Sequence, residues 1–236
     1  MDKKKRIPLS KKRLLHDMKI LRKNPIENVF VHWTEENLYN PVAILVGPKN
    51  TPYENGFYGI KFRFTTKFPF EPPKATFVTT DGRVRMNPNL YACGKVCLSI
   101  LGTWSGPQWT SVQNLTSIIL SIQTILNDTP IHNEPGYENI KPTHPKFSTY
   151  NKLIQHANIR VGVIQMLEKI PKDFVMLLPN IKQYFKENYE WYKTHCIQNL
   201  KTYYNKKIKS PIYRWEEKFN YENLLEKLII LKKQIN

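Results

Sequence analysis

The chain has 236 residues, of which 41% are hydrophobic and 12% aromatic, and its formal net charge is +17 at pH 7. This composition supports a folded core and excludes a largely disordered chain. Because there is no run of about 18 apolar residues and no apolar segment behind the basic N-terminus, we expect neither a membrane span nor a secretion signal. The expected location is the cytoplasm or the nucleus.

The positive charge is concentrated at the two ends of the chain. Residues 1–23 contain ten Lys or Arg against two acids, and residues 181–236 contain twelve against six. The sequence has neither the zinc-finger spacing of cysteine and histidine nor the glycine-aromatic stretch of RNA-recognition domains, which makes nucleic acid an unlikely partner. A solvated basic surface, or one that meets an acidic protein, is preferred. The run Lys3–Arg6 also has the composition of a nuclear address.

The first predicted element is a helix over residues 10–23. Ser10 is placed to cap its N-terminus and Pro25 lies just beyond its end. Apolar residues recur on one face at helical spacing: Leu14, Leu15, Met18 and Leu21. The pattern indicates a short amphipathic helix with a basic outer face.

Four β-rich segments follow, separated by turn-forming pairs. The segments are 28–33, 41–47, 57–64 and 74–79, and the turn-forming pairs are Gly47-Pro48, Asn55-Gly56 and Pro72-Pro73. This order predicts an antiparallel meander. Residues 114–126 then have the apolar spacing of a buried helix, which we expect to pack across the sheet.

From about residue 149 onward the apolar positions recur every three or four residues, with interruptions at Pro171, Pro179 and Pro211. This pattern predicts a helical C-terminal region. The aromatic segment at 184–192 is too apolar for a free tail. We therefore expect an α+β fold in three parts: a basic N-terminal tail (1–9), a core (10–168) and a helical extension packed on the core (169–236).

Two of the three cysteines, Cys93 and Cys97, lie four positions apart in an irregular segment. The spacing is a poor disulfide framework, and a zinc site would need a second ligand pair that the sequence lacks, so we expect no metal. A buried structural cysteine is the plain alternative for Cys97. The nearby Asn89 adds a second interpretation, because a thiol beside a positioned amide suits acyl transfer, in which the amide stabilises an oxyanion.

The motifs around these cysteines occur in the order and spacing of one known family. They are Phe68-Pro69-Phe70-Glu71-Pro72-Pro73-Lys74, Asn87-Pro88-Asn89, Gly94-Lys95-Val96-Cys97-Leu98-Ser99-Ile100-Leu101, and Trp109 before a helix. Together they resemble the core of the ubiquitin-conjugating enzymes. The segments Gly102–Pro107 and His132–Glu138 resemble the Z-type subgroup, and the resemblance continues into the C-terminal helices. It implies the family's UBC fold, with residues 10–168 as the catalytic core.

The resemblance also implies the reaction and its residues. Cys97 matches the nucleophile that accepts ubiquitin, or a ubiquitin-like modifier, as a thioester from an activating enzyme and passes it to a substrate lysine, usually with a ligase. Asn89 matches the asparagine that stabilises the oxyanion or braces the loop, and Glu134 matches an acidic residue that orients the lysine and favours its neutral amine. Cys93 is an incidental neighbour. No cofactor is implied, since ATP is used by the activating enzyme.

Partner surfaces follow from the same resemblance. Lys12, Arg13 and His16 match positions that meet an acidic domain of the activating enzyme, although a solvated helix face is an alternative. Three further residues match positions in the two loops that commonly meet RING-type ligases: Phe70, Ser111 and Val112. For Phe70 the alternative is a core position beside the two prolines.

The sequence departs from the family pattern at two places. Asn87 stands where the family usually has histidine, a change that the Z-type subgroup shares. In the usual Trp-Ser-Pro motif this chain has Trp109-Thr110-Ser111, which leaves the choice of ligase open.

Other function classes fit the sequence less well. A cysteine protease would need an imidazole at the thiol, for which only His132 and His144 lie near enough downstream. A solvated loop position or a local hydrogen bond is the plainer interpretation of both histidines. A catalytically inactive UBC-fold binding protein and a basic nucleic-acid-binding module are the remaining alternatives, and the presence of Cys97 argues against the first.

Overall fold

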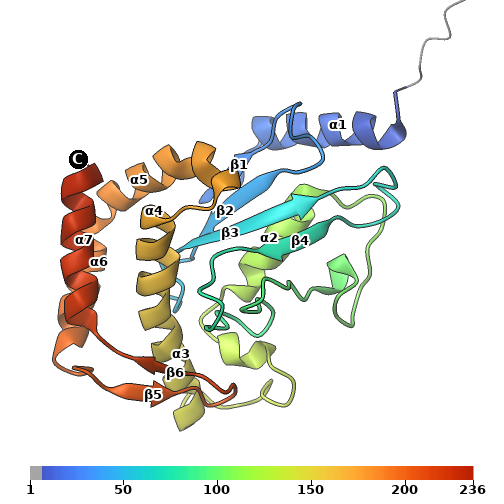
Figure 1. Ribbon diagram of the computed structural model, residues 1–236. Helices are drawn as coiled ribbons and strands as arrows, with labels where there is room; N and C mark the ends of the chain where they lie inside the picture. The colour runs from blue at the N-terminus through green and yellow to red at the C-terminus, as the bar shows by residue number, and fades with distance from the viewer. Residues whose placement is uncertain (1–6, 236) are drawn as a thin grey trace, which may run out of the picture.

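The computed structural model of the chain describes residues 7–235 and has the expected α+β architecture, with one sheet between two sets of helices (Figure 1). The elements of the first part are α1 (Leu9–Lys23), β1 (Val29–His32), β2 (Val42–Val46), β3 (Phe57–Arg63), β4 (Lys74–Phe77), the short helix η1 (Ser99–Leu101), α2 (Leu115–Ile125) and the short helix η2 (Pro130–Asn133). The elements that follow are α3 (Pro145–Ala157), the π-helix η3 (Asn158–Gln165), α4 (Met166–Glu168), η4 (Lys172–Leu177), α5 (Leu178–Glu187), α6 (Tyr189–Leu200), β5 (Lys207–Lys209), β6 (Glu216–Lys218) and α7 (Tyr221–Ile235). The predicted N-terminal helix, four-strand meander and buried helix are confirmed.

The start of α1 differs from the prediction. The helix begins at Leu9, and its N-cap residue is Pro8, so the prediction that Ser10 caps it was wrong. The hydroxyl of Ser10 instead lies 2.9 Å from that of Tyr39. Because a proline has no side-chain acceptor, the first N–H groups of α1 have no side-chain cap.

The four strands pair in the order β1-β2-β3-β4, all antiparallel. All five residues of β2 are buried. Because side chains alternate along a strand, its two faces contribute to different hydrophobic clusters. Ala43 and Leu45 face α1 and α2, whereas Val42, Ile44 and Val46 face the C-terminal extension.

The inner face of the sheet is covered mainly by α2. This helix is capped by Asn114, whose side chain accepts a hydrogen bond from the backbone N–H of Ser117 at 3.0 Å. Its apolar stripe is fully buried: Leu115, Ile118, Ile119, Ile122 and Ile125. Burial of such a stripe is the main stabilisation that a helix of this length receives.

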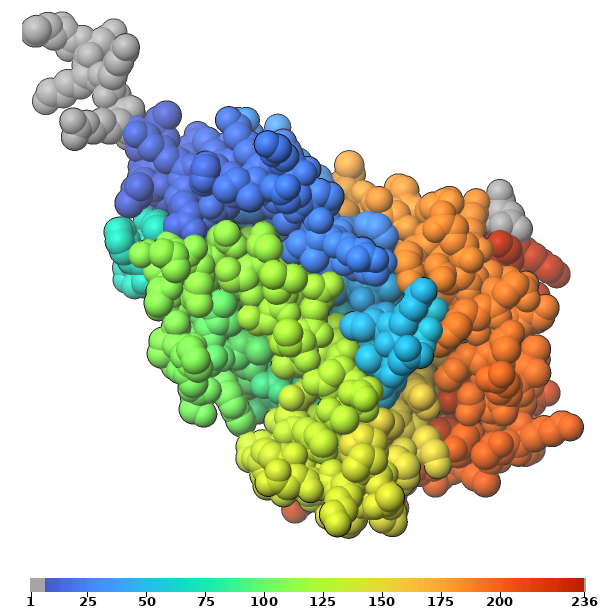
Figure 2. All heavy atoms as spheres, turned by 180° about the vertical axis from the view of Figure 1, so that it is seen from behind, coloured from blue at the N-terminus to red at the C-terminus, as the bar shows by residue number. Residues whose placement is uncertain are grey.

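The outer face of the sheet is covered by the extension. Phe174 of η4 is buried and lies directly on Gly59 of β3, where an added Cβ would come 3.2 Å from its ring. The same cluster includes Phe185 of α5, Tyr192 of α6 and Leu228 of α7. Figure 2 shows α5 and α6 as a continuous block on one flank, with α1 on the opposite side of the molecule.

The apolar periodicity predicts a helical C-terminal extension. The extension is mostly helical, but it also contains two strands. It contains the hairpin β5–β6, whose register pairs Ile208 with Glu217, between α6 and α7. The aromatic segment at 184–192 is divided between two helices, α5 and α6, which are separated by Asn188. The domain boundary at residue 168 stays a prediction, and the run Lys3–Arg6 lies outside the described residues.

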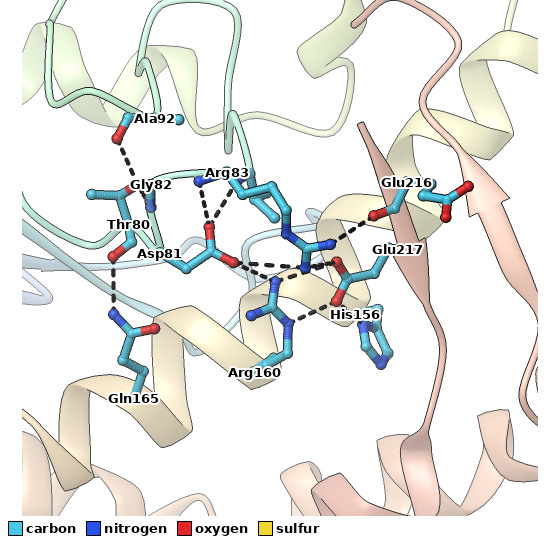
Figure 3. A network of polar contacts seen from close by, with 11 residues as sticks. Thr80, Asp81, Gly82, Arg83, Ala92, His156, Arg160, Gln165, Glu216 and Glu217 are labelled. Carbon is cyan, nitrogen blue, oxygen red and sulfur yellow. Dashed lines mark hydrogen bonds and ion pairs between the residues drawn. The ribbon is translucent and has the colours of Figure 1, made fainter. Parts of the chain in front are cut away.

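A charged cluster attaches the hairpin to the rest of the fold (Figure 3). The buried carboxylate of Glu217 accepts hydrogen bonds from Arg160 at 2.7 Å and Arg83 at 2.8 Å, and lies 3.1 Å from His156 Nδ1. Arg160 also donates to Asp81 at 2.8 Å. His156 Nε2 accepts from a backbone N–H, so Nδ1 carries the proton of a neutral ring. Every ionised member of this cluster therefore has an opposite charge beside it.

This charged cluster and a second buried histidine, His195 of α6, predict a loss of stability in acid. Burial lowers the pKa of His156 and lowers the pKa of His195 to about 4. An unfolded histidine takes up a proton below about pH 6.5, whereas the folded rings resist it, so stability present above that pH is lost as the pH falls. Burial opposes the shift in Glu217, but His156 and Arg160 hold the pKa of this carboxyl below its ordinary value, which adds a further loss below about pH 4.5.

For His195 alone we expect about 2 kcal/mol less stability at pH 5 than at pH 7.5. Urea unfolding at several pH values measures this difference. His195→Gln should flatten the dependence, whereas replacement of the exposed His16 should leave it unchanged. Equal pH slopes in the wild type and His195→Gln would contradict the prediction.

Candidate active site

The segment from residue 87 to residue 97 folds back on itself through two isolated bridges, Asn87 with Leu90 and Leu90 with Val96. As a result Asn89 and Cys97 lie side by side and exchange two hydrogen bonds. The backbone N–H of Cys97 donates to Asn89 O at 2.9 Å, and Asn89 Nδ2 donates to Cys97 O at 2.7 Å. The amide of Asn89 thus lies on the backbone of Cys97, and its expected part in stabilising an oxyanion stays a prediction.

The three cysteines have different surroundings. Cys97 is 1% exposed, Cys93 is exposed and Cys196 lies in the core of the extension. Burial raises the pKa of the Cys196 thiol to about 12, which keeps it protonated and unreactive. Exposure alone would favour Cys93 as the reactive thiol, whereas the contact with Asn89 favours Cys97.

The residues after Cys97 turn back and brace it. Helix η1 ends at Gly102, whose φ of 67° lies in the left-handed region that favours glycine. The hydroxyl of Thr103 donates to Val96 O at 2.8 Å and accepts from the N–H of Leu98 at 2.9 Å. One side chain from the lengthened segment thus holds the backbone on both sides of the thiol.

Asn87 connects the cysteine segment to the loop that carries Glu134. Its Oδ1 accepts from the N–H of Asn89 at 2.8 Å and from Asn133 Nδ2 at 3.5 Å. Its Nδ2 donates to Ile125 O at 2.8 Å. A buried amide has two donors and an acceptor oxygen, so it satisfies more neighbours than a neutral imidazole with one of each. This gives a physical reason for asparagine at this position.

Glu134 ends the short helix η2 and is half-buried. One of its carboxylate oxygens accepts a hydrogen bond from the hydroxyl of Tyr213, which lies in the loop of the β5–β6 hairpin. The chain thus brings Asn89, Cys97 and Glu134 into one hydrogen-bonded neighbourhood through Asn87 and Asn133.

Comparison with known families places this geometry in context. The family model described as ubiquitin-conjugating enzyme matches residues 13–157. The chain belongs to the ubiquitin-conjugating enzyme family. The matched region includes α1, the sheet, the cysteine segment and the Glu134 loop, so the family's fold accounts for the whole first part of the chain.

The relatives extend the similarity into the C-terminal part. The chain is 36% identical over 225 residues to "Ubiquitin-conjugating enzyme E2 Z" of Danio rerio. This alignment covers 94% of this chain and 68% of the relative. The human protein of the same description is also 36% identical, with 94% and 63% covered. Among solved structures, human ubiquitin-conjugating enzyme E2 G1 aligns with a TM-score of 0.44 and 29% identity, covering 51% of this chain and 96% of that one. The resemblance to the Z-type subgroup is therefore confirmed along nearly the whole sequence.

The residues expected to meet the activating enzyme differ in solvent exposure and in the contacts that their side chains already make. Lys12 and His16 are exposed on α1. Arg13 pairs with Asp17 at 2.8 Å and donates to the backbone oxygens of residues 111–113, at 2.6 Å for Ser111. Arg13 therefore attaches α1 to the neighbouring loop, and its role in binding a partner stays a prediction.

The residues expected to meet a ligase are all exposed. Phe70 is 71% exposed and Val112 is 81% exposed, and Ser111 is also on the surface. Trp109 ties the two loops together by donating to Pro69 O at 2.7 Å. The alternative of a core position for Phe70 is wrong, and an exposed aromatic side chain of this kind is a suitable anchor for a protein partner.

Sequence reasoning missed two residues of the site. Thr103 stands in the segment recognised as lengthened, but its hydroxyl gave no separate signal. Tyr213 could not be found, because it is 79 residues from Glu134 along the chain. His132 and His144 make only local hydrogen bonds, to Ile140 O and from the N–H of Lys146. Within residues 7–235, no group of three metal-binding side chains and no helix able to cross a membrane is found.

Proposed function

We propose that this protein accepts ubiquitin, or a ubiquitin-like modifier, as a thioester on Cys97 and transfers it to the amine of a lysine. The observation that carries the proposal is the paired contact between Asn89 and Cys97. It holds an amide side chain against the backbone of the cysteine, within a chain of the ubiquitin-conjugating family.

Loading is an exchange between two thioesters. The thiolate of Cys97 attacks the carbonyl carbon of the modifier's terminal glycine on the activating enzyme, and that enzyme's cysteine leaves as a thiolate. Transfer follows when a neutral lysine amine attacks the Cys97 thioester, forms an amide and releases the Cys97 thiolate. Both steps pass through a tetrahedral oxyanion, but only the second uses a neutral amine, a weaker nucleophile than a thiolate, and has a proton to remove. Stabilising that oxyanion and removing that proton are the parts suited to Asn89 and Glu134.

The burial of Cys97 adds a requirement. A thiol that is 1% exposed cannot be reached by a protein-sized partner without rearrangement, so loading requires the segment around it to open. Such an opening has to break the two hydrogen bonds by which Thr103 holds Val96 and Leu98 on either side of the thiol.

The experiment that tests the proposal is a charging assay on the full chain. The protein is incubated with ATP, ubiquitin or a ubiquitin-like modifier, and each of a panel of activating enzymes. We expect an adduct of the modifier's mass that disappears on treatment with a thiol reductant. If none of the modifier and enzyme combinations gives such an adduct, the protein is an inactive member of the family.

Separating loading from transfer tests the roles of Asn89 and Glu134. Asn89→Ala is expected to load at a near-normal rate and to discharge to free lysine about tenfold more slowly, because oxyanion stabilisation or the brace on Cys97 is lost. Asn139→Ala, at an exposed position, serves as the matched control. Single-turnover discharge measures the effect, and equal losses in both steps would mean a damaged fold.

Glu134→Ala should also load normally and discharge slowly. Its defect should shrink between about pH 7 and pH 9.5, because bulk solvent then deprotonates more of the lysine, whose reference pKa is near 10.4. A defect that stays constant with pH would leave Glu134 only a role in positioning.

The remaining roles follow from the proposed reaction. The chain would need an activating enzyme, which uses the ATP, and a RING-type or other ligase that meets Phe70 and Val112. No cofactor of its own is required. We propose a cytoplasmic or nuclear location, where these partners and reduced thiols occur together.

A further inference from the structure

The loop of the C-terminal hairpin reaches the candidate active site through Tyr213. Its hydroxyl donates a hydrogen bond to Oε2 of Glu134. Burial, and then the hydrogen bond to Glu134, raise the pKa of Tyr213 well above its ordinary value, so the hydroxyl remains a proton donor through neutral and mildly alkaline pH. A residue far outside the family-matched region 13–157 therefore contacts one of the proposed catalytic residues.

The ring of Tyr213 is held by Arg85, which lies just before the cysteine segment, and by Tyr150 of α3. The guanidinium of Arg85 lies 4.4 Å from its centroid and 3.5 Å from that of Tyr91, so the cation is enclosed between two aromatic rings. The ring of Tyr150 packs against Tyr213 at 6.3 Å between centroids. Cation–π and edge contacts of this kind restrict the ring to one orientation. The hydroxyl is therefore directed at Glu134 by neighbours on two sides.

The hairpin that carries Tyr213 is itself fixed in place. Its loop is closed by a backbone hydrogen bond from Ser210 to Trp215 O at 2.8 Å. Its second strand is attached to the rest of the fold by Arg83, which donates to Glu216 O at 2.9 Å and to the carboxylate of Glu217 at 2.8 Å (Figure 3). Arg83 lies two residues before Arg85. The charged cluster and the aromatic contacts thus act on the same short stretch of the fold.

The geometry of a carboxylate explains what this contact can do. Glu134 has two oxygens, and the hydroxyl of Tyr213 occupies a position on Oε2. The other oxygen is left to accept a hydrogen bond from an incoming amine. A carboxylate fixed at one oxygen loses less rotational freedom when the amine arrives, so pre-organisation by Tyr213 lowers the cost of positioning the lysine.

We infer that Tyr213 is a positioning residue for the transfer step, which holds Glu134 in the orientation that receives the substrate lysine. Transfer then depends on a correctly docked extension, whereas loading does not. This inference rests on the proposed function, because it assigns Tyr213 a part in the reaction proposed for Cys97.

The test uses Tyr213→Phe, which removes the hydroxyl and keeps the ring between Arg85 and Tyr150. Tyr204→Phe is the matched control, because this tyrosine lies in the same extension and is 65% exposed. We expect Tyr213→Phe to load at the wild-type rate and to discharge to free lysine about fivefold more slowly, which corresponds to one hydrogen bond of roughly 1 kcal/mol. As with Glu134→Ala, the defect should shrink as the pH rises.

The same change in a Glu134→Ala background separates positioning from a general structural role. A tyrosine that acts through the carboxylate has no further effect once the carboxylate is gone, so the double variant should discharge at the rate of Glu134→Ala alone. Two multiplying defects, or wild-type discharge by Tyr213→Phe, would overturn the inference while leaving the proposed function intact. A wild-type chain that accepts no modifier would overturn both.

Discussion

Replacing Cys97 by serine is expected to convert the reductant-sensitive adduct into one that resists thiol reductants. The serine hydroxyl occupies nearly the same place and forms an oxyester, which thiols exchange far less readily than a thioester. Because a hydroxyl is a weaker nucleophile than a thiolate, the adduct should also form more slowly.

Cys93→Ser is the matched control for this experiment, since Cys93 lies four residues away and is the more exposed of the two thiols. It should leave charging largely intact. Gel analysis with and without reductant distinguishes the variants. If Cys93→Ser abolished charging in a folded protein while Cys97→Ser did not, the assignment of the nucleophile would be wrong.

Ending the chain after Glu168 is expected to give an insoluble or unfolded product. The deletion uncovers the outer face of the sheet, where Val42, Ile44 and Val46 are at most 3% exposed in the complete chain. It also removes Glu217, which leaves Arg160 without its main partner. An exposed apolar sheet face, and a half-buried guanidinium left with Asp81 as its acidic partner, both favour aggregation over folding.

A point substitution measures how much the contact between the extension and the sheet contributes to the free energy of unfolding. Phe174→Ala should lower the free energy of unfolding by about 3–5 kcal/mol, because the ring is fully buried against Gly59. Met176→Ala, two residues further on, should have little effect, since Met176 is 65% exposed. Chemical denaturation measures both. A soluble truncated protein with an unchanged melting curve would show that the extension folds independently of the core.

The parts of the fold that could be predicted from the sequence are those with strong periodicity. The strand segments and the helix over residues 115–125 have uninterrupted apolar patterns and clear turn residues, and they were found to within about two residues at each end, as is usual for such boundaries. The proximity of Asn89 and Cys97 could be predicted from the motif, because their contact joins two arms of one short turn.

The hairpin β5–β6 was missed for a physical reason. Each strand has only three residues, and five of the six are charged, so neither is long or apolar enough to give a recognisable strand signal. Glu217 can be buried because Arg83, Arg160 and His156 surround its carboxylate. All three partners lie far from Glu217 in the sequence. Local patterns contain no information on such partners.

The candidate site shows the same limit. Tyr213 reaches Glu134 only because the hairpin is docked, and that docking depends on the charged cluster. Nothing in the sequence around Tyr213 resembles a catalytic motif.

The burial of β2 on both faces has a consequence for how the protein is made. The helical residues in the cluster on its outer face begin at Leu153, more than a hundred positions after Val46, and continue to Leu231. At a synthesis rate of about 5–20 residues per second, the catalytic part leaves the ribosome roughly 3–14 s before its cover is complete. During this interval an incompletely covered apolar sheet face is open to water, which makes the nascent chain prone to aggregation until the extension docks.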